Sequence, residues 1–335
     1  MSAAFASAPG IPREPNGSVV TVGTFDGVHR GHWEVLQETR RWAERDGRRG
    51  VLATFHPHPL RVLRPEVAPA LLTTPLEKEE ILAESGLEYA VFLPFTRALA
   101  EFSPTRFVRE VLIERLHLRR LVIGYDHGFG KGRSGDVATL RRIGDRLGFE
   151  VHVVPAVHMD GEAISSSQIR RALQAGDVAT AAAGLGRPYS FRGTVVRGLG
   201  RGRPLLGFAT ANIEAPGPEK LLPREGVYVV QARVRGELRD GVLHLGPRPV
   251  FQDAPPSIEL HLFDFDQDVY GEEIQVLFCQ RLRDIHPFAT VEALVDAIRA
   301  DCDAARAWLS GGGCGGRGGQ GSRAATCRKT GAPLQ

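Results

Sequence analysis

Two histidines lie close together near the amino end of the chain, in the stretch GTFDGVHRGH at 23–32. His29 and His32 are three residues apart, so on the first turn of a helix they point to the same side. Two imidazole donors beside the free amides of a helix N-terminus favour a bound phosphate and can stabilise charge on a leaving pyrophosphate. Two alternatives stay open here: helix-capping histidines, and a two-histidine metal site that lacks a third ligand.

A second candidate phosphate site lies far along the chain, in ISSSQIR at 164–170. Its serines begin a predicted helix, and Arg170 follows one turn later. Hydroxyls, helix amides and a guanidinium together form a phosphate cradle, whereas serines alone are more typical of a simple helix cap. Between the two motifs, the glycine-laden loop at 124–136 carries Lys131 and Arg133. It is typical of a lid over phosphates and equally of a surface loop.

The second half of the chain holds another glycine-rich segment, GLGRGRPLLGFATANI at 198–213. Glycines there let backbone amides meet a nucleotide phosphate, and Thr210 and Asn212 offer oxygen ligands that suit Mg²⁺. Glycine content alone favours a flexible loop between strands. Glu259, in SIELHLFDFD, is a candidate general base, but strand alternation by itself places it with His261 on a solvent face.

The elements that must position these residues differ between the two halves. In the first half, apolar and often β-branched runs predict strands at 19–25, 51–55, 89–95, 120–124 and 150–157. Helices are predicted to begin at Thr74-Pro75 and at Ser103-Pro104, because a cap residue followed by proline is typical of a helix start. Continuous apolar strands separated by helices indicate a parallel sheet covered on both faces, with ligands beyond the carboxyl ends of its strands.

The pattern changes at about 183–188, where short alternating runs separated by turn residues begin. Such spacing predicts an antiparallel barrel, which is followed by one helix from Thr290. Residues after this helix are glycine-rich and almost without large apolar side chains, so they cannot offset the entropy of ordering. The expected organisation is a flexible N-terminus at 1–17, an α/β domain at 18–184, a barrel domain at 185–309 and a disordered tail at 310–335.

Composition argues against several function classes. Four basic residues and no acidic ones lie in 311–335, which leaves 38 basic against 39 acidic residues elsewhere, too balanced for a general nucleic-acid surface. No apolar run of about 18 residues and no signal peptide is recognisable, so we expect a cytoplasmic protein without a membrane span. The cysteines form no CxxC pair, and we expect reduced thiols at Cys279, Cys302, Cys314 and Cys327.

The ordered set of motifs resembles the bacterial bifunctional riboflavin kinase/FAD synthetases. GTFDGVHRGH and ISSSQIR are similar to the HxGH and ISSTxIR signatures of nucleotidylyltransferases, and TFHPHP, FGKGRSGD and LGRPYSFRGTVV narrow the likeness to this family. The resemblance implies a Rossmann-like nucleotidylyltransferase α/β domain followed by an antiparallel riboflavin-kinase barrel with a terminal helix. It implies that riboflavin and ATP give FMN in the barrel, that FMN and ATP give FAD and pyrophosphate in the α/β domain, and that both steps use Mg²⁺.

The same resemblance assigns roles to individual residues. The implied catalytic residues are His29, His32, Arg170 and Glu259. The implied ATP and phosphate contacts are Gly23, Phe25, Asp26, Gly27, Ser165, Ser166, Gly200, Gly202 and Gly207. Asp126 and Phe129 are the implied flavin contacts, and Thr210 and Asn212 the implied Mg²⁺ ligands. The chain departs from the commoner family pattern at Thr24, Ser167, His127, Gly128, Ala209 and His244.

Two further functions stay open. In one, only the adenylyltransferase is active and the barrel is a flavin-binding regulatory module, as the altered 198–209 loop would allow. In the other, the chain is a non-catalytic flavin-nucleotide sensor, which would not need the four implied catalytic residues. The expected partners are the small molecules ATP, riboflavin and FMN, with no nucleic acid and no membrane, and we expect a monomer or a weak homo-oligomer.

Overall fold

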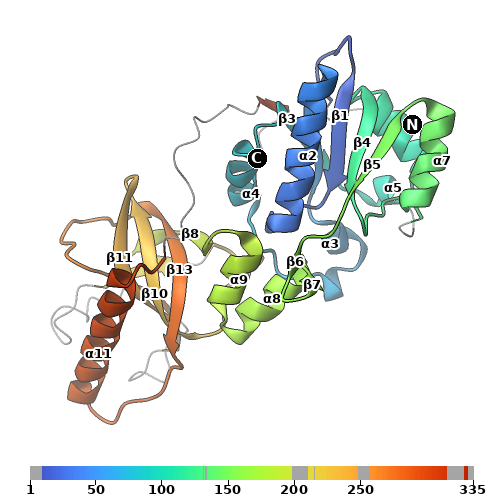
Figure 1. Cartoon of the computed structure of the whole chain (residues 1–335). Helices are drawn as coiled ribbons and strands as arrows, with labels where there is room; N and C mark the ends of the chain where they lie inside the picture. Colours follow the sequence, from blue (N-terminus) through green and yellow to red (C-terminus); the bar gives the residue numbers. More distant parts are fainter. Residues whose placement is uncertain are drawn as a thin grey trace. The chain divides into compact units, whose positions relative to one another are not determined.

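The computed structural model describes residues 10–130, 132, 134–197, 210–214, 216–247, 257–314 and 328–330. The chain divides into two compact units. The first comprises the residues up to 69, residues 75–165 and those from 321 on, and the second comprises 70–74 and 166–320. Each unit has its own β-structure, an open sheet in the first and a closed barrel in the second (Figure 1). The predicted fold class is confirmed.

The first unit contains a six-stranded sheet in the order β14-β3-β2-β1-β4-β5. Every neighbouring pair in it is parallel. Its strands are β1 (Ser18–Gly23), β2 (Arg49–His56), β3 (Tyr89–Pro94), β4 (Leu118–Gly124), β5 (Glu150–Val154) and β14 (Arg328–Thr330). A separate small hairpin joins β6 (His158–Met159) and β7 (Glu162–Ala163).

Helices cover both faces of this sheet, because its central strands are apolar on both sides. Val20 and Val22 of β1 lie in one core cluster with Phe107, while Val19 lies in another with Leu36 of the first helix. Figure 1 shows this helix, α2, running along the sheet. The helical elements are α2 (Arg30–Asp46), α3 (Pro59–Leu63), η1 (Pro65–Val67), α4 (Pro75–Ala83), α5 (Arg97–Ala100), α6 (Pro104–Phe107), the π-helical η2 (Val108–Ile113) and α7 (Val137–Leu147).

Both ends of the chain are more ordered than expected where the structure describes them. Ile11 is buried in the core of the first unit, and its amide donates to the Arg115 carbonyl at 3.2 Å. The described part of this segment, residues 10–17, is therefore attached to the first unit. Residues 328–330 form β14 beside β3, within the tail that was expected to be disordered. The edge strand β3 offers unpaired backbone groups, so even a polar segment can bind there through its main chain.

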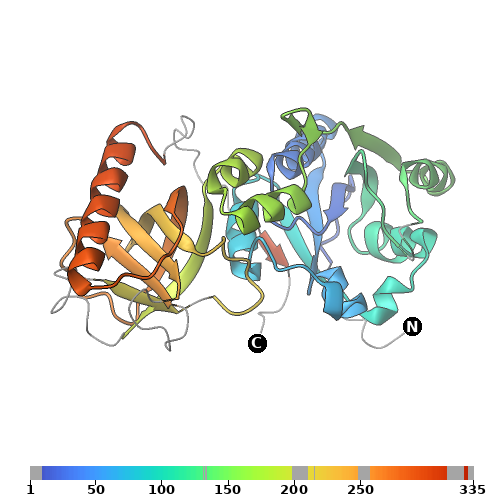
Figure 2. The same cartoon turned by 90° about the horizontal axis from the view of Figure 1, so that it is seen from below.

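The second unit is built on a closed antiparallel barrel in the order β10-β11-β12-β9-β8-β13. Its strands are β8 (Tyr189–Val196), β9 (Ala211–Glu214), β10 (Gly226–Val234), β11 (Glu237–Gly246), β12 (Ser257–Leu262) and β13 (Glu273–Arg283). Helix α11 (Val291–Ser310) lies along the barrel (Figure 2), capped by Thr290 as the sequence predicts. Helices α8 (Ser166–Ala175) and α9 (Val178–Leu185) also belong to this unit, because α9 packs on β8 and β13.

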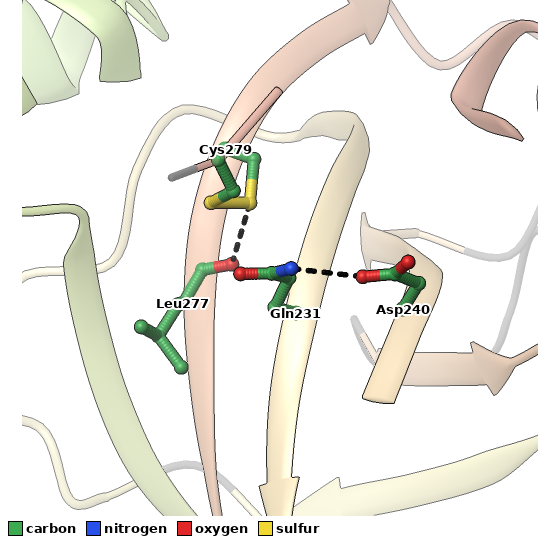
Figure 3. The surroundings of a disulfide bond; sticks show 5 residues. Gln231, Asp240, Leu277 and Cys279 are labelled. Carbon is green, nitrogen blue, oxygen red and sulfur yellow. Dashed lines mark hydrogen bonds between the residues drawn. A yellow bond between two sulfur atoms is a disulfide. The ribbon is translucent and has the colours of Figure 1, made fainter. Parts of the chain in front are cut away.

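The expected reduced state is wrong for two of the cysteines. Cys279 of β13 and Cys314, just beyond α11, form a disulfide with their Cα atoms 5.0 Å apart (Figure 3). Sequence spacing gives no hint of this pair, because it depends on α11 folding back over the barrel and returning the chain to β13. Cys302 is a buried free thiol in the same apolar cluster, and burial raises its pKa to about 11.

Candidate active sites

The first candidate site lies where β1 ends and α2 begins. His29 is the N-cap residue of α2, and its Nδ1 accepts a hydrogen bond from the His32 amide at 3.3 Å. The two imidazole rings stack with their centroids 3.7 Å apart. His29 therefore caps α2, and the rings of His29 and His32 lie on the same side of its first turn. Since Nδ1 of His29 is an acceptor, the proton of the neutral ring is on Nε2, which is then a donor.

Close packing around these rings explains two glycines of the motif. A Cβ at Gly31 would lie 3.2 Å from Cε1 and Nδ1 of His29, so a larger residue would push the ring away. A Cβ at Gly23 would lie 3.0 Å from Cε2 of Phe25. Phe25 in turn packs against His32, with ring centroids 4.9 Å apart. The glycines thus make room for a cluster of three aromatic rings at the end of β1.

A buried lysine, which has no signal in the sequence, lies beside the same turn. Lys78 of α4 is only 8% exposed, and its Nζ donates to the Thr24 carbonyl at 3.1 Å and to Thr54 Oγ1 at 3.4 Å. Burial lowers the pKa of Lys78 to about 8, while the nearby Asp26 carboxylate acts in the opposite direction. Asp26 itself is buried. Because Lys78 stands among glutamates on a predicted helix, the sequence favours a solvent-exposed side chain.

The serine–arginine motif begins α8, as predicted. Ser165 belongs to the first unit, whereas Ser166 and Arg170 belong to the second. The Arg170 Nε donates to the Ala70 carbonyl at 2.8 Å, a backbone contact within the second unit. Segment 70–74 is held there by further contacts, since Lys220 Nζ donates to the Leu72 carbonyl at 2.8 Å. Arg170 therefore has a structural contact in addition to the phosphate role that the sequence suggests.

The two predicted flavin contacts have different surroundings. Asp126 is exposed just after β4. Phe129 is buried in the core of the first unit, with its ring centroid 4.9 Å from that of Phe107, and its carbonyl accepts from the Gly135 amide at 2.9 Å. The predicted lid cations Lys131 and Arg133 lie outside the described residues.

The second candidate site is assembled by strand register in the barrel. Glu259 of β12 is the direct cross-strand partner of Asn212 on β9 and of His244 on β11. Glu259 is half-buried, and its Oε1 accepts from Ser257 Oγ at 3.0 Å. Alternation is as predicted, with Ile258, Leu260 and Leu262 buried on the other face. The face of Glu259 is not a plain solvent face, because three adjacent strands present polar side chains there in one row.

His244 adds a titratable group to this row. Burial lowers its pKa below the ordinary value, and the Glu259 carboxylate partly opposes that shift. The ring is therefore neutral at pH 7, and its Nε2 lies 3.0 Å from the Pro247 carbonyl, which can only accept. Thr210 lies immediately before β9, two residues from Asn212. The remaining predicted loop residues, Gly200, Gly202 and Gly207, lie outside the described residues.

Oxygen-bearing side chains of the kind that bind Mg²⁺ lie at the second site. The described residues contain no cluster of three or more His, Cys, Asp or Glu side chains that could hold a metal ion. Thr210, just before β9, and Asn212 on β9 carry hydroxyl and amide oxygens, and Glu259, the cross-strand partner of Asn212, carries a carboxylate. Mg²⁺ prefers such oxygen ligands and takes others from water and substrate phosphates.

Comparison with known proteins shows the family to which the chain belongs. A family model for FAD synthetase matches residues 11–168, and one for riboflavin kinase matches residues 185–309. The bifunctional riboflavin kinase/FMN adenylyltransferase of Pseudomonas fluorescens is 38% identical over 295 residues, which cover 88% of this chain and 94% of the relative. The chain belongs to this bifunctional family. The Bacillus subtilis member is also 38% identical, over 87% of this chain and 92% of the relative.

A solved structure has the same architecture as this bifunctional riboflavin kinase/FMN adenylyltransferase family member. It is described as a macrolide-efflux protein from Streptococcus pneumoniae, is 33% identical, and aligns with a TM-score of 0.80 over 88% of this chain and 96% of that one. Within the described residues, no helix combines the length and apolarity needed to cross a membrane. From the two family-model matches, the chain contains an FAD synthetase domain and a riboflavin kinase domain.

Proposed function

We propose that this chain converts riboflavin to FMN in its barrel and FMN to FAD in its α/β unit, using the residues described above. The stacked His29–His32 pair at the start of α2 is the observation that carries the proposal. We also propose domains at 18–184 and 185–309. The family-model matches at 11–168 and 185–309 support two domains in this order, while the compact units divide between Ser165 and Ser166.

In the α/β unit, a phosphate oxygen of FMN attacks the α-phosphorus of ATP, and the bond to the leaving pyrophosphate breaks. His29 and His32 donate hydrogen bonds to the phosphates, and the N-terminal amides of α2 add their dipole. Ser165, Ser166 and Arg170 supply further phosphate contacts. Gly23, Phe25, Asp26 and Gly27 shape the nucleotide pocket, and Asp126 and Phe129 belong to the flavin side.

In the barrel, Glu259 accepts the proton of the riboflavin 5′-hydroxyl as that oxygen attacks the γ-phosphorus of ATP, and ADP leaves. A general base of this kind must lie within hydrogen-bond reach of the hydroxyl. Thr210 and Asn212 would hold Mg²⁺, which neutralises charge on the transferred phosphoryl group. Gly200, Gly202 and Gly207, which lie outside the described residues, are assigned to ATP binding.

One incubation tests both assignments. Purified protein is given riboflavin with Mg-ATP, or FMN with Mg-ATP, and the flavins are separated by chromatography. FMN and FAD from riboflavin support the full proposal. If FAD forms from FMN but no FMN forms from riboflavin, the activity is restricted to adenylyl transfer. If neither flavin gives a product, both enzyme functions are excluded and a non-catalytic flavin-nucleotide sensor is the remaining hypothesis.

We further propose a cytoplasmic, monomeric or weakly associating enzyme that binds small molecules and no nucleic acid. The near balance of charge outside the tail supports this. In a reducing cytoplasm, Cys279 and Cys314 would form a dithiol. Size-exclusion chromatography coupled to light scattering measures the mass, and a mass of a stable dimer at micromolar concentration would overturn the monomer.

A further inference from the structure

The turn that presents the two histidines has an unfavourable backbone. Phe25 and Val28 have φ angles of 47° and 40°, and neither is a glycine. Residues other than glycine rarely adopt this left-handed backbone conformation. Val28 is β-branched, which makes the conformation less favourable still. Both side chains are buried, at 3% and 0% exposure. Such a turn keeps its shape only when its surroundings hold it in place.

The Thr24 carbonyl, just before Phe25, is held by two donors. Lys78 Nζ donates to it at 3.1 Å and Thr54 Oγ1 donates to it at 3.0 Å. The two donors are themselves 3.4 Å apart, so they form one small network. The ammonium group also lies 5.7 Å from the centroid of the Phe92 ring. Hydrogen bonds from a charged donor are about twice as strong as neutral ones, so Lys78 is the stronger of the two anchors.

Burial of an ammonium group at this position has a large cost in free energy. Lys78 lies on α4 beside the fully buried Leu82, and a core of this kind accepts an apolar side chain at lower free energy. The carboxylate of Asp26 acts on the Lys78 ammonium and opposes the effect of burial on its pKa. Asp26 belongs to the same turn. The Lys78 ammonium group thus interacts with two groups of the histidine-bearing turn, the Thr24 carbonyl and the Asp26 carboxylate.

We propose that Lys78 is a positioning residue for adenylyl transfer, fixing the Thr24–His29 turn so that His29 and His32 meet the phosphates in the transition state. The inference rests on the proposed function of those two histidines. It requires no contact between Lys78 and substrate. It predicts that loss of the ammonium group lowers turnover more than it weakens substrate binding, because the histidines remain present but are held less well.

The test uses the full chain with Lys78→Met, which keeps the length of the side chain and removes its charge and donors. Steady-state FAD formation from FMN and Mg-ATP gives kcat and both KM values, and FMN formation from riboflavin is measured on the same preparation. Two matched variants accompany it. Thr54→Val removes the neutral anchor. Leu82→Ala weakens the apolar cluster that α4 shares with Phe25 and Val28, but it removes neither donor to the Thr24 carbonyl.

The expected result for Lys78→Met is a kcat for FAD formation lower by about 10-fold to 100-fold, the range that loss of a charged hydrogen bond gives. Both KM values stay within about threefold, and riboflavin kinase activity is unchanged. Thr54→Val has a smaller effect on kcat. Leu82→Ala lowers the melting temperature yet keeps the wild-type kcat at a temperature where it is folded.

Three outcomes would overturn the inference. These are an unchanged kcat in folded Lys78→Met, a raised KM with normal kcat, and a Leu82→Ala variant that loses kcat equally. If Lys78→Met does not fold, the smaller kcat loss in Thr54→Val supports the inference, and a normal kcat there overturns it. His29→Ala separates the two proposals. Normal FAD formation in His29→Ala would overturn the proposed function. If His29→Ala loses FAD formation but Lys78→Met keeps the wild-type kcat, only the role of Lys78 is overturned.

Discussion

The two candidate sites are built in opposite ways. The residues from Gly23 to His32 that are proposed for adenylyl transfer lie in one continuous stretch, and a turn with its helix start sets their geometry. Asn212 and Glu259, which are proposed for the kinase site, are far apart in the sequence, and the register of three neighbouring strands brings them together with His244. A site of the first kind is visible in a motif. One of the second kind consists of residues that look ordinary until the strands are paired.

The difference also concerns how each site is held. The first depends on a backbone conformation that neighbours such as Lys78 and Thr54 stabilise through a single carbonyl. The second depends on barrel closure, in which every strand is hydrogen-bonded on both sides. Damage to the first site should therefore be local, whereas damage to the barrel should reach the second site through stability.

The largest effect is expected at the kinase base. Glu259→Gln keeps the shape of the side chain but cannot accept the proton, so FMN formation from riboflavin should fall by about 10²-fold to 10⁴-fold. FAD formation from supplied FMN should be unchanged, as separated flavins would show. Glu237→Gln, on an exposed glutamate of the same barrel, is the matched control. Equal loss of both activities in Glu259→Gln would contradict separate sites.

The mirror-image experiment removes the histidine pair. His29→Ala with His32→Ala should lower FAD formation by about 10²-fold to 10³-fold, the loss typical of removed transition-state donors. FMN formation should be spared. His29→Asn separates two roles, because asparagine caps helices well but lacks the imidazole. Wild-type FAD formation in His29→Asn would mean that His29 serves only as a cap.

The stability of the barrel should depend on the disulfide, whereas the stability of the first unit should not. Cys314→Ser is expected to lower the free energy of unfolding of the barrel by about 2–4 kcal/mol under oxidising conditions. Denaturant unfolding, with FMN formation as the readout for the barrel, measures this. Wild-type protein in reducing agent should behave like the variant. A matching loss in the unfolding of the first unit would contradict the independence of the two regions.

The smallest effect is expected at Gly31. Gly31→Ala places a Cβ 3.2 Å from the His29 ring, so FAD formation should fall by about tenfold or less. Alanine favours a helix by about 1 kcal/mol over glycine, so the first unit should be no less stable. Kinetics and thermal unfolding of the same sample test this pairing. Normal FAD formation would show that the His29 ring can move without consequence.

Much of the fold could be predicted from the sequence because its signals are local. The apolar runs that became the central strands β1, β2 and β4 are buried on both faces, and the caps before Pro104 and Val291 begin helices as expected. The tail could not be predicted in the same way. Strand β14 is held by the edge of β3 through backbone pairing, which amino-acid composition does not encode.

By itself the sequence determined the family, the two fold classes and the histidine motif, because these depend on short-range order along the chain. Tertiary structure alone decided three further features: the burial of Lys78 beside Thr24, the row of Asn212, Glu259 and His244, and the Cys279–Cys314 bond. Each joins residues from separate elements. Their contacts arise from helix packing and strand register, and neither residue type nor spacing along the chain specifies which partners meet.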